Sequence, residues 1–142
     1  MARPSAYFLD TCVPIYAAGR DHPYREPCVR IVLAVADGEI EAVTDAEVIQ
    51  EIAYRFHAIH RRTEGLKLAE AFLSLVEAVL PVTRREVARS LQLQRNYSFL
   101  SPRDAIHVAV MEGAGLNRIV TADRHFDRVS EVERVDPTGL EW

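Results

Sequence analysis

The sequence predicts an α/β fold, a three-layer α/β/α sandwich with a mainly parallel sheet of about five strands. Three observations lead to this prediction. The hydrophobic period switches repeatedly between strand-like and helix-like along the chain. Short apolar runs are interleaved with helical stretches, which is typical of parallel strands covered on both faces. The 142 residues, 49% of them apolar and 27% charged, suffice for one core, and no linker or repeat divides them, so residues 1–142 are expected to form one domain.

The N-terminal part of the chain is expected to form a strand followed by two helices. Residues 6–9 are a short apolar run, and the small residues after it, with Pro14 near the first turn, predict a helix that ends near Ala18. A turn at 19–23 precedes a second helix, which stops at Gly38.

The next part is expected to form a strand, a helical hairpin and a second strand. Residues 41–44 read as the strand, and its final threonine or Asp45 caps a long helix. Gly65 breaks this helix and leaves a second helical arm at 66–80. Residues 81–83, which begin with a proline, supply a brief strand.

The C-terminal part is expected to hold two helices and two strands. A helix begins at Arg84, and Ser101 with the proline after it starts another that runs to about Gly113. The apolar residues 119–121 form the next strand, and residues 132–135 form the last one.

Cysteine content and the absence of targeting patterns indicate a reduced, cytoplasmic protein. Cys12 and Cys28 lie outside any C-x-x-C or Cys/His ligand spacing, so neither a disulfide framework nor a zinc site is expected. Residues 1–4 lead directly into the first predicted strand, so no signal peptide is expected. No apolar run approaches the ~20 residues needed to span a bilayer, so no membrane anchor is expected.

The overall charge argues against a protein that coats nucleic acid through a basic surface. The formal net charge is −4 and the pI is about 5.7. Two arginine-rich stretches, at 55–67 and 84–95, are available to hold a phosphate backbone, although each is equally well read as a solvated helix face. The acidic excess therefore needs another explanation.

Four acidic residues fall at the ends of predicted strands or on the helices beside those ends: Asp10, Glu51, Asp104 and Asp123. Ligands of an open α/β sheet bind in the crevice at the carboxyl ends of its strands, where these carboxylates would lie close together. Such a cluster repels itself unless a cation is present, and Mg²⁺ or Mn²⁺ prefers oxygen ligands. The pattern predicts metal-dependent cleavage of phosphodiester bonds.

Each acid also has a purely structural interpretation. Asp10 and Asp123 follow strands and precede helices, so both can be simple helix caps. A lone helical acid such as Glu51 is commonly a solvated surface residue. Asp104 can occupy the third position of a capping box that begins at Ser101. Asp127 can be an acidic residue on the surface of a helix. The common position of these acids favours a functional site, because helix caps that arise independently are not expected to gather at one edge of one sheet.

Four segments of the sequence resemble the PIN-domain ribonucleases, and most closely the VapC-type toxins of toxin-antitoxin pairs. The segments are LDTCV, VIQEIAYR, SPRDAIHVAV and IVTADRHFDRV. The resemblance implies that Asp10, Glu51, Asp104 and Asp123 are the metal-binding acids and that Asp127 matches an additional acid of some members. It further implies that Thr11 and Thr121 are hydroxyl residues that line the site.

The same resemblance implies Mg²⁺- or Mn²⁺-dependent cleavage of RNA, a homodimer, and a cognate antitoxin that occupies the groove. From the chemistry, Asp10, Asp104 and Asp123 are expected to touch metal directly, and Glu51 directly or through water. Arg103 or Arg124 is expected to hold the flanking phosphate. No catalytic role is assigned to His107 or His125.

Two other functions remain open at the level of sequence. A phosphatase of the haloacid dehalogenase type also begins with an aspartate at the first strand end, but its second acid would stand where this chain has Cys12. The second alternative is an inactive PIN module that binds RNA or protein. Retention of all four acids argues against it.

Overall fold

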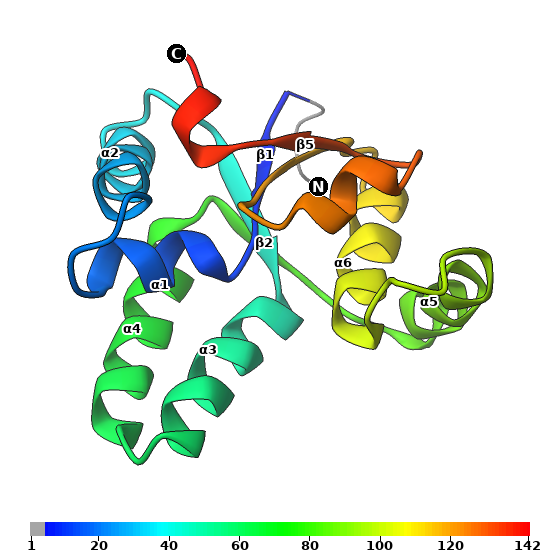
Figure 1. The fold of residues 1–142 in the computed structure, drawn as a ribbon, viewed down its shortest axis with the longest axis horizontal. Helices are drawn as coiled ribbons and strands as arrows, with labels where there is room; N and C mark the ends of the chain where they lie inside the picture. The colour runs from blue at the N-terminus through cyan, green and yellow to red at the C-terminus, as the bar shows by residue number, and fades with distance from the viewer. Residues whose placement is uncertain (1–4) are drawn as a thin grey trace.

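One sheet of five parallel strands, in the order β3-β2-β1-β4-β5, forms the centre of the computed structural model, which describes residues 5–142 (Figure 1). The strands are β1 (Tyr7–Leu9), β2 (Ala42–Asp45), β3 (Ala78–Leu80), β4 (Arg118–Val120) and β5 (Glu133–Val135). Strand β1 pairs with β2 on one side and with β4 on the other. The predicted parallel sheet is confirmed. The expectation of no signal peptide falls on residues 1–4, which lie outside the described residues.

Helices cover both faces of the sheet, as the sequence predicts. The helices are α1 (Cys12–Ala18), α2 (Arg25–Ala36), α3 (Ala46–Ala58), α4 (Arg62–Leu75), α5 (Arg84–Asn96) and α6 (Pro102–Gly113), with short 3₁₀ segments η1 (Arg124–Arg128) and η2 (Pro137–Gly139). Figure 1 shows α1, α2 and α4 on one side of β1 and β2, with α5 and α6 on the other. Within residues 5–142, no helix is long and apolar enough to cross a membrane.

The order of the strands creates a switch point between β1 and β4. The chain passes from β1 outward to β2 and β3, and it then returns to place β4 on the opposite side of β1. Segments that follow two such neighbouring strands diverge, which opens a crevice at their carboxyl ends. Asp10 comes directly after β1, and Asp123 lies three residues after the end of β4.

The central strands are apolar on both faces because helices bury both. Phe8, Leu9, Ile119 and Val120 are completely buried. Removing each such side chain from water stabilises the fold by about 1.5–3 kcal/mol. A rigid pair of strands therefore supports the residues that follow β1 and β4.

The break in the helical hairpin differs from the prediction. The chain turns at residues 59–61, where His60 adopts a left-handed backbone with φ of 61°, and Gly65 lies inside α4. A Cβ atom at Gly65 would lie 2.3 Å from Cβ of Phe56. The glycine therefore permits close packing of α3 on α4 and does not end a helix.

The third strand also differs from the prediction, because it lies before Pro81 and not after it. Helix α4 ends at Leu75, and residues 78–80 pair in parallel with β2. Proline has no N–H to give to a sheet ladder, which explains why Pro81 follows the strand. The prediction of a helix to residue 80 and a strand at 81–83 was wrong.

Candidate metal centre

The four predicted acids line a single cavity of about 370 Å³ at the carboxyl ends of β1 and β4. Asp10 follows β1, and Asp123 follows β4. Glu51 comes from the second turn of α3, and Asp104 comes from the first turn of α6. Four segments that are distant in sequence thus bring their carboxylates to one place.

Two threonines fix the carboxylate of Asp10, which is only 7% exposed. The backbone N–H of Thr11 donates to Oδ1 at 2.8 Å, and the hydroxyl of Thr121 donates to Oδ2 at 2.7 Å. Both threonines are buried and line the cavity, as predicted. Because both oxygens are held, Asp10 has one defined orientation beneath the cavity.

Glu51 is buried, which contradicts its interpretation as a solvated surface residue. The Thr11 hydroxyl donates to Oε1 at 2.7 Å, and the Arg55 guanidinium lies 2.7 Å from Oε2. Arg103 lies 3.7 Å from the same Oε2 and also pairs with Glu47. These partners compensate a buried carboxylate that would otherwise be costly.

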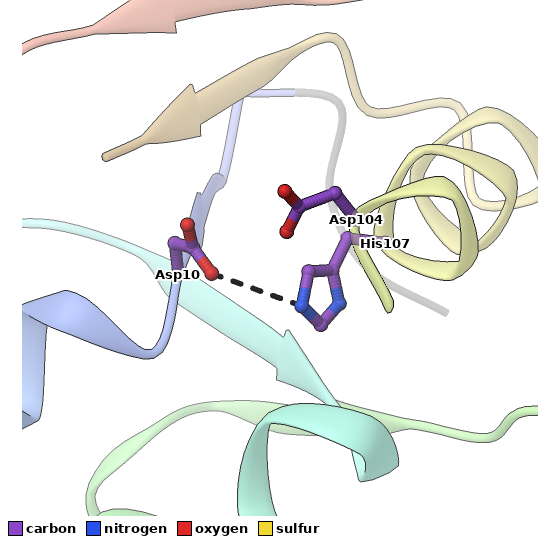
Figure 2. Close-up of side chains that lie close together, drawn as sticks. All are labelled: Asp10, Asp104 and His107. Carbon is purple, nitrogen blue, oxygen red and sulfur yellow. Dashed lines mark ion pairs between the residues drawn. The ribbon is translucent and has the colours of Figure 1, made fainter. Parts of the chain in front are cut away.

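Asp104 and Asp123 each combine a local structural role with a place on the cavity wall. Ser101 caps α6 by accepting the Asp104 backbone N–H at 3.1 Å, while the Asp104 carboxylate points toward Asp10 (Figure 2). Asp123 accepts the backbone N–H of His125 at 2.9 Å and so caps η1. The structural and functional interpretations of these acids are therefore compatible.

One ligand atom each from Asp10, Asp104 and His107 lies within 4.8 Å of the other two. Nε2 of His107 lies 3.7 Å from Oδ1 of Asp10 (Figure 2) and has no hydrogen-bond partner among the described residues. Two carboxylates at this spacing fit a bound divalent cation, because hard cations prefer oxygen ligands, while the His107 ring faces one of these carboxylates. The donor set is thus chemically suited to the predicted metal.

Burial and mutual repulsion raise the pKa values of two acids of the cavity, Asp10 and Asp104. Burial, followed by the negative charge of Asp10, raises the pKa of Asp104 to about 6. Burial also raises the pKa of Asp10, and the charge of Glu51 adds to this effect. Burial alone would lower the pKa of His107, but the charge and hydrogen bond of Asp45, with Asp10 and Asp104, raise it to about 9. The cluster holds an excess of negative charge that a cation would relieve.

The remaining predicted residues divide into those at the cavity and those away from it. Arg103 lines the cavity. Arg124 is exposed, and neither it nor Asp127 is among the described residues that line the cavity. Asp127 pairs instead with Arg134 at 2.9 Å.

The sequence did not place three residues at this site, although Arg55 lay in an arginine-rich stretch and Asp45 was expected to cap a helix. Arg55 and Tyr16 line the cavity, and Asp45 binds His107 behind it. The spacing of Arg55 four residues after Glu51 was a detectable signal, because such pairs meet on a helix surface. Cys12 also lines the cavity, and burial together with the Asp10 charge raises its pKa to about 12, so its thiol stays neutral.

The chain matches the family model of the PIN domain over residues 7–132. It is 35% identical over 127 residues to a VapC ribonuclease of Mycobacterium bovis and to ribonuclease VapC13 of Mycobacterium tuberculosis, covering 89% of this chain and 97% of each relative. Ribonuclease VapC7 of Mycobacterium tuberculosis is 35% identical over 91% of this chain and 90% of the relative.

Solved structures share the fold at lower sequence identity. VapC20 of Mycobacterium tuberculosis, described as a toxin that cleaves the sarcin-ricin loop, superposes with a TM-score of 0.73 at 16% identity, covering 88% of this chain and 95% of that one. A chain of the DNA-bound VapBC complex of Salmonella typhimurium superposes with a TM-score of 0.71 at 20% identity, covering 96% and 99%.

Proposed function

Because this chain belongs to the PIN-domain family, and within it to the VapC ribonucleases, we propose that it is a metal-dependent endoribonuclease. It hydrolyses RNA phosphodiester bonds with an activated water and requires Mg²⁺ or Mn²⁺. The observation that carries the proposal is the gathering of Asp10, Glu51, Asp104 and Asp123 around one cavity. The shared location of the four acids, together with the raised pKa values of Asp10 and Asp104, is typical of functional sites.

Asp10, Asp104 and Asp123 would hold the cation, and Glu51 would support it directly or through water. Metal bound by these acids would supply neutralisation of the charge on the phosphate and activation of water. Thr11 and Thr121 keep Asp10 in a fixed orientation, so little reorganisation is needed when the ion and substrate arrive.

Arginines at the cavity bind the RNA backbone next to the acids. Arg55 and Arg103 line the cavity and are anchored by Glu51, which keeps both guanidinium groups at its wall. Arg103 holds a flanking phosphate, and the exposed Arg124 assists beyond the cavity. This placement lets an acidic protein attract a polyanion at one site.

The two alternative functions have less support. A phosphatase of the haloacid dehalogenase type needs a second acid two residues after Asp10, where this chain has the neutral thiol of Cys12. An inactive PIN module that binds no metal does not explain four carboxylates around one cavity, because their mutual repulsion destabilises the fold when no cation is bound.

The protein acts as the toxin of a toxin-antitoxin pair, as its VapC relatives suggest. An apolar groove of about 850 Å³ lies between the end of α1 and the α3–α4 hairpin, and it shares Tyr16 and Arg55 with the acidic cavity. A hydrophobic segment of the antitoxin fits this groove, from which a basic side chain reaches the acids. A second copy of the chain covers further apolar surface in a homodimer.

Cleavage of single-stranded RNA tests the enzymatic proposal. The purified protein should cut RNA in the presence of Mg²⁺ or Mn²⁺, stop when EDTA is added, and resume when metal is restored. The Asp10→Asn variant, purified in parallel, controls for a contaminating ribonuclease. Cleavage that persists in EDTA, or in this variant, would rule the proposal out.

A further inference from the structure

A fully buried pair, Asp45 and His107, lies directly behind the acidic cavity. Nδ1 of His107 lies 2.7 Å from Oδ2 of Asp45, and both side chains are completely inaccessible. Within residues 5–142, neither residue lines the cavity. The pair therefore touches the acids from the protein side, and RNA cannot reach it.

Asp45 joins the two helices that carry Glu51 and Asp104. Its Oδ1 accepts the backbone N–H of Val48 at 2.9 Å and so caps α3, on which Glu51 lies one turn further. Its Oδ2 holds His107, which lies one turn after Asp104 on α6. One carboxylate thus fixes the start of α3 relative to α6.

The ring of His107 has contacts on two further sides. The ring of Phe8 in β1 packs against it, with 5.4 Å between the centroids. Nε2 faces Oδ1 of Asp10 at 3.7 Å, as Figure 2 shows. The imidazole is therefore held by β1 and by Asp45 while it faces an acid of the cavity, and its orientation is fixed by packing as well as by hydrogen bonding.

We infer that Asp45 and His107 are positioning residues that set the spacing of Asp10, Glu51 and Asp104 for metal binding. The inference rests on the proposed function, since it concerns the same metal site. Outer partners of metal-binding groups commonly affect affinity by 10–100-fold, although they do not touch the substrate. A role in folding alone predicts instead that loss of one partner lowers the melting temperature, because the other partner is left buried and unpaired, while the folded variants keep their Mn²⁺ affinity.

The test measures Mn²⁺ affinity by calorimetry, together with circular dichroism and melting temperature. His107→Leu keeps the apolar packing but removes the contact with Asp45, so Mn²⁺ affinity should fall by about 10–100-fold. His107→Asn should restore most of the affinity, because its amide nitrogen can replace the Nδ1 donor. Asp45→Asn keeps the cap on Val48 but loses the carboxylate, and a fall in affinity is expected here too.

The double variant Asp45→Asn/His107→Leu should bind Mn²⁺ no more weakly than the weaker single variant, because both changes break one contact. Thr83→Ala removes the capping box of α5, a helix that contributes no residue to the cavity wall among the described residues, and serves as a control that lowers the melting temperature without changing affinity.

The outcomes separate this inference from the proposed function. Folded variants that bind Mn²⁺ as tightly as the native protein would overturn the inference alone, as would strictly additive losses or an asparagine variant as weak as the leucine one. If His107→Leu does not fold, Asp45→Asn and His107→Asn carry the same comparison. A native protein that binds no Mn²⁺ would overturn both the inference and the metal-dependent function.

Discussion

The carboxylates of the cavity place function and stability in opposition. Asp10 and Asp104 are buried or partly buried close to one another, and burial raises the pKa of both groups. A metal-free site therefore holds charges that weaken the fold. Residues with such unfavourable environments are typical of active sites, where stability is lost in exchange for activity.

Replacement of Asp10 or Asp104 by asparagine should separate these two effects. Each change keeps the side-chain size but removes a ligand charge, so RNA cleavage should fall by at least about 100-fold. The metal-free variants should melt no lower than the native protein, because repulsion is reduced. Single-turnover cleavage and thermal melting measure the two effects, with the exposed Asp37→Asn as control. Wild-type cleavage by Asp104→Asn would leave that residue only the structural role.

Divalent metal should stabilise the native protein through the same carboxylates. A ligand that binds only the folded state raises its stability by about 2.7 kcal/mol at a hundred times its dissociation constant. Mg²⁺ or Mn²⁺ should therefore raise the melting temperature, and Asp10→Asn should reduce the rise. Unchanged melting at millimolar metal, with no heat of binding, would count against a cation at this site.

At the level of elements, the helical hairpin shows what the sequence could and could not reveal. Strand–helix alternation predicted most elements, because buried strands and amphipathic helices differ in hydrophobic period. The same signal misplaced the hairpin turn, since a glycine in a helix reads as a break. Only the packing of Gly65 against Phe56 distinguishes a glycine that permits contact from one that ends a helix.

Gly65→Ala should therefore destabilise the protein, although alanine usually favours a helix. The added Cβ would overlap Cβ of Phe56 and push α3 and α4 apart, at a cost of about 1–3 kcal/mol. Gly113→Ala in α6 is the matched control, because nothing lies within 4 Å of the added atom. Chemical denaturation measures the free energy of unfolding of both variants. A Gly65→Ala variant as stable as the Gly113→Ala control would show that the hairpin repacks freely.

The C-terminal segment should confer a specific sensitivity to acid. Partial burial would raise the pKa of Asp136, but hydrogen bonds from Thr138, Tyr24 and Arg134 outweigh it and lower the pKa from 3.8 to about 2. A lowered carboxyl pKa stabilises the fold above the unfolded value, and this stability is lost as the pH falls from 3.8 toward 2.

Asp136→Asn has no charge to lose, so its melting temperature should depend less on pH between about 4 and 2 than that of the native protein. At neutral pH the variant should melt lower, and the difference should narrow with acidification. A difference that stays constant across this range would assign the acid sensitivity to other groups.

At the scale of the whole molecule, the site is a consequence of topology. The sequence predicted that Asp10, Glu51, Asp104 and Asp123 converge, because each lies at or beside the end of a parallel strand. The buried network behind them was not predictable, since a cap such as Asp45 and a helical histidine give no sign of their contact until the helices are placed. Asp127 illustrates the opposite case, because its position on the chain suggested a site that its pairing with Arg134 does not support.

Apolar surface on the α3–α4 hairpin should be covered by other chains. Phe72 is buried, but Tyr54, Ile59 and Leu66 remain 54%, 55% and 42% exposed. Light scattering should report a dimer, and co-expression with the neighbouring reading frame should relieve growth arrest and yield a tight complex.

Ile59→Asp should weaken that complex without slowing RNA cleavage, because Ile59 lies outside the acidic cavity. A monomer that is harmless when expressed alone would defeat the toxin assignment.

The position of β4 beside β1 determines when during synthesis the protein can become active. Asp10 depends on the hydroxyl of Thr121, which lies 111 residues later in the chain. A nascent chain that ends before β4 contains three of the four acids, but it lacks this anchor, Asp123 and one of the two partner strands of β1. Contacts between such distant residues form late in folding. The ribosome must therefore synthesise nearly the whole chain before this enzyme can cut RNA.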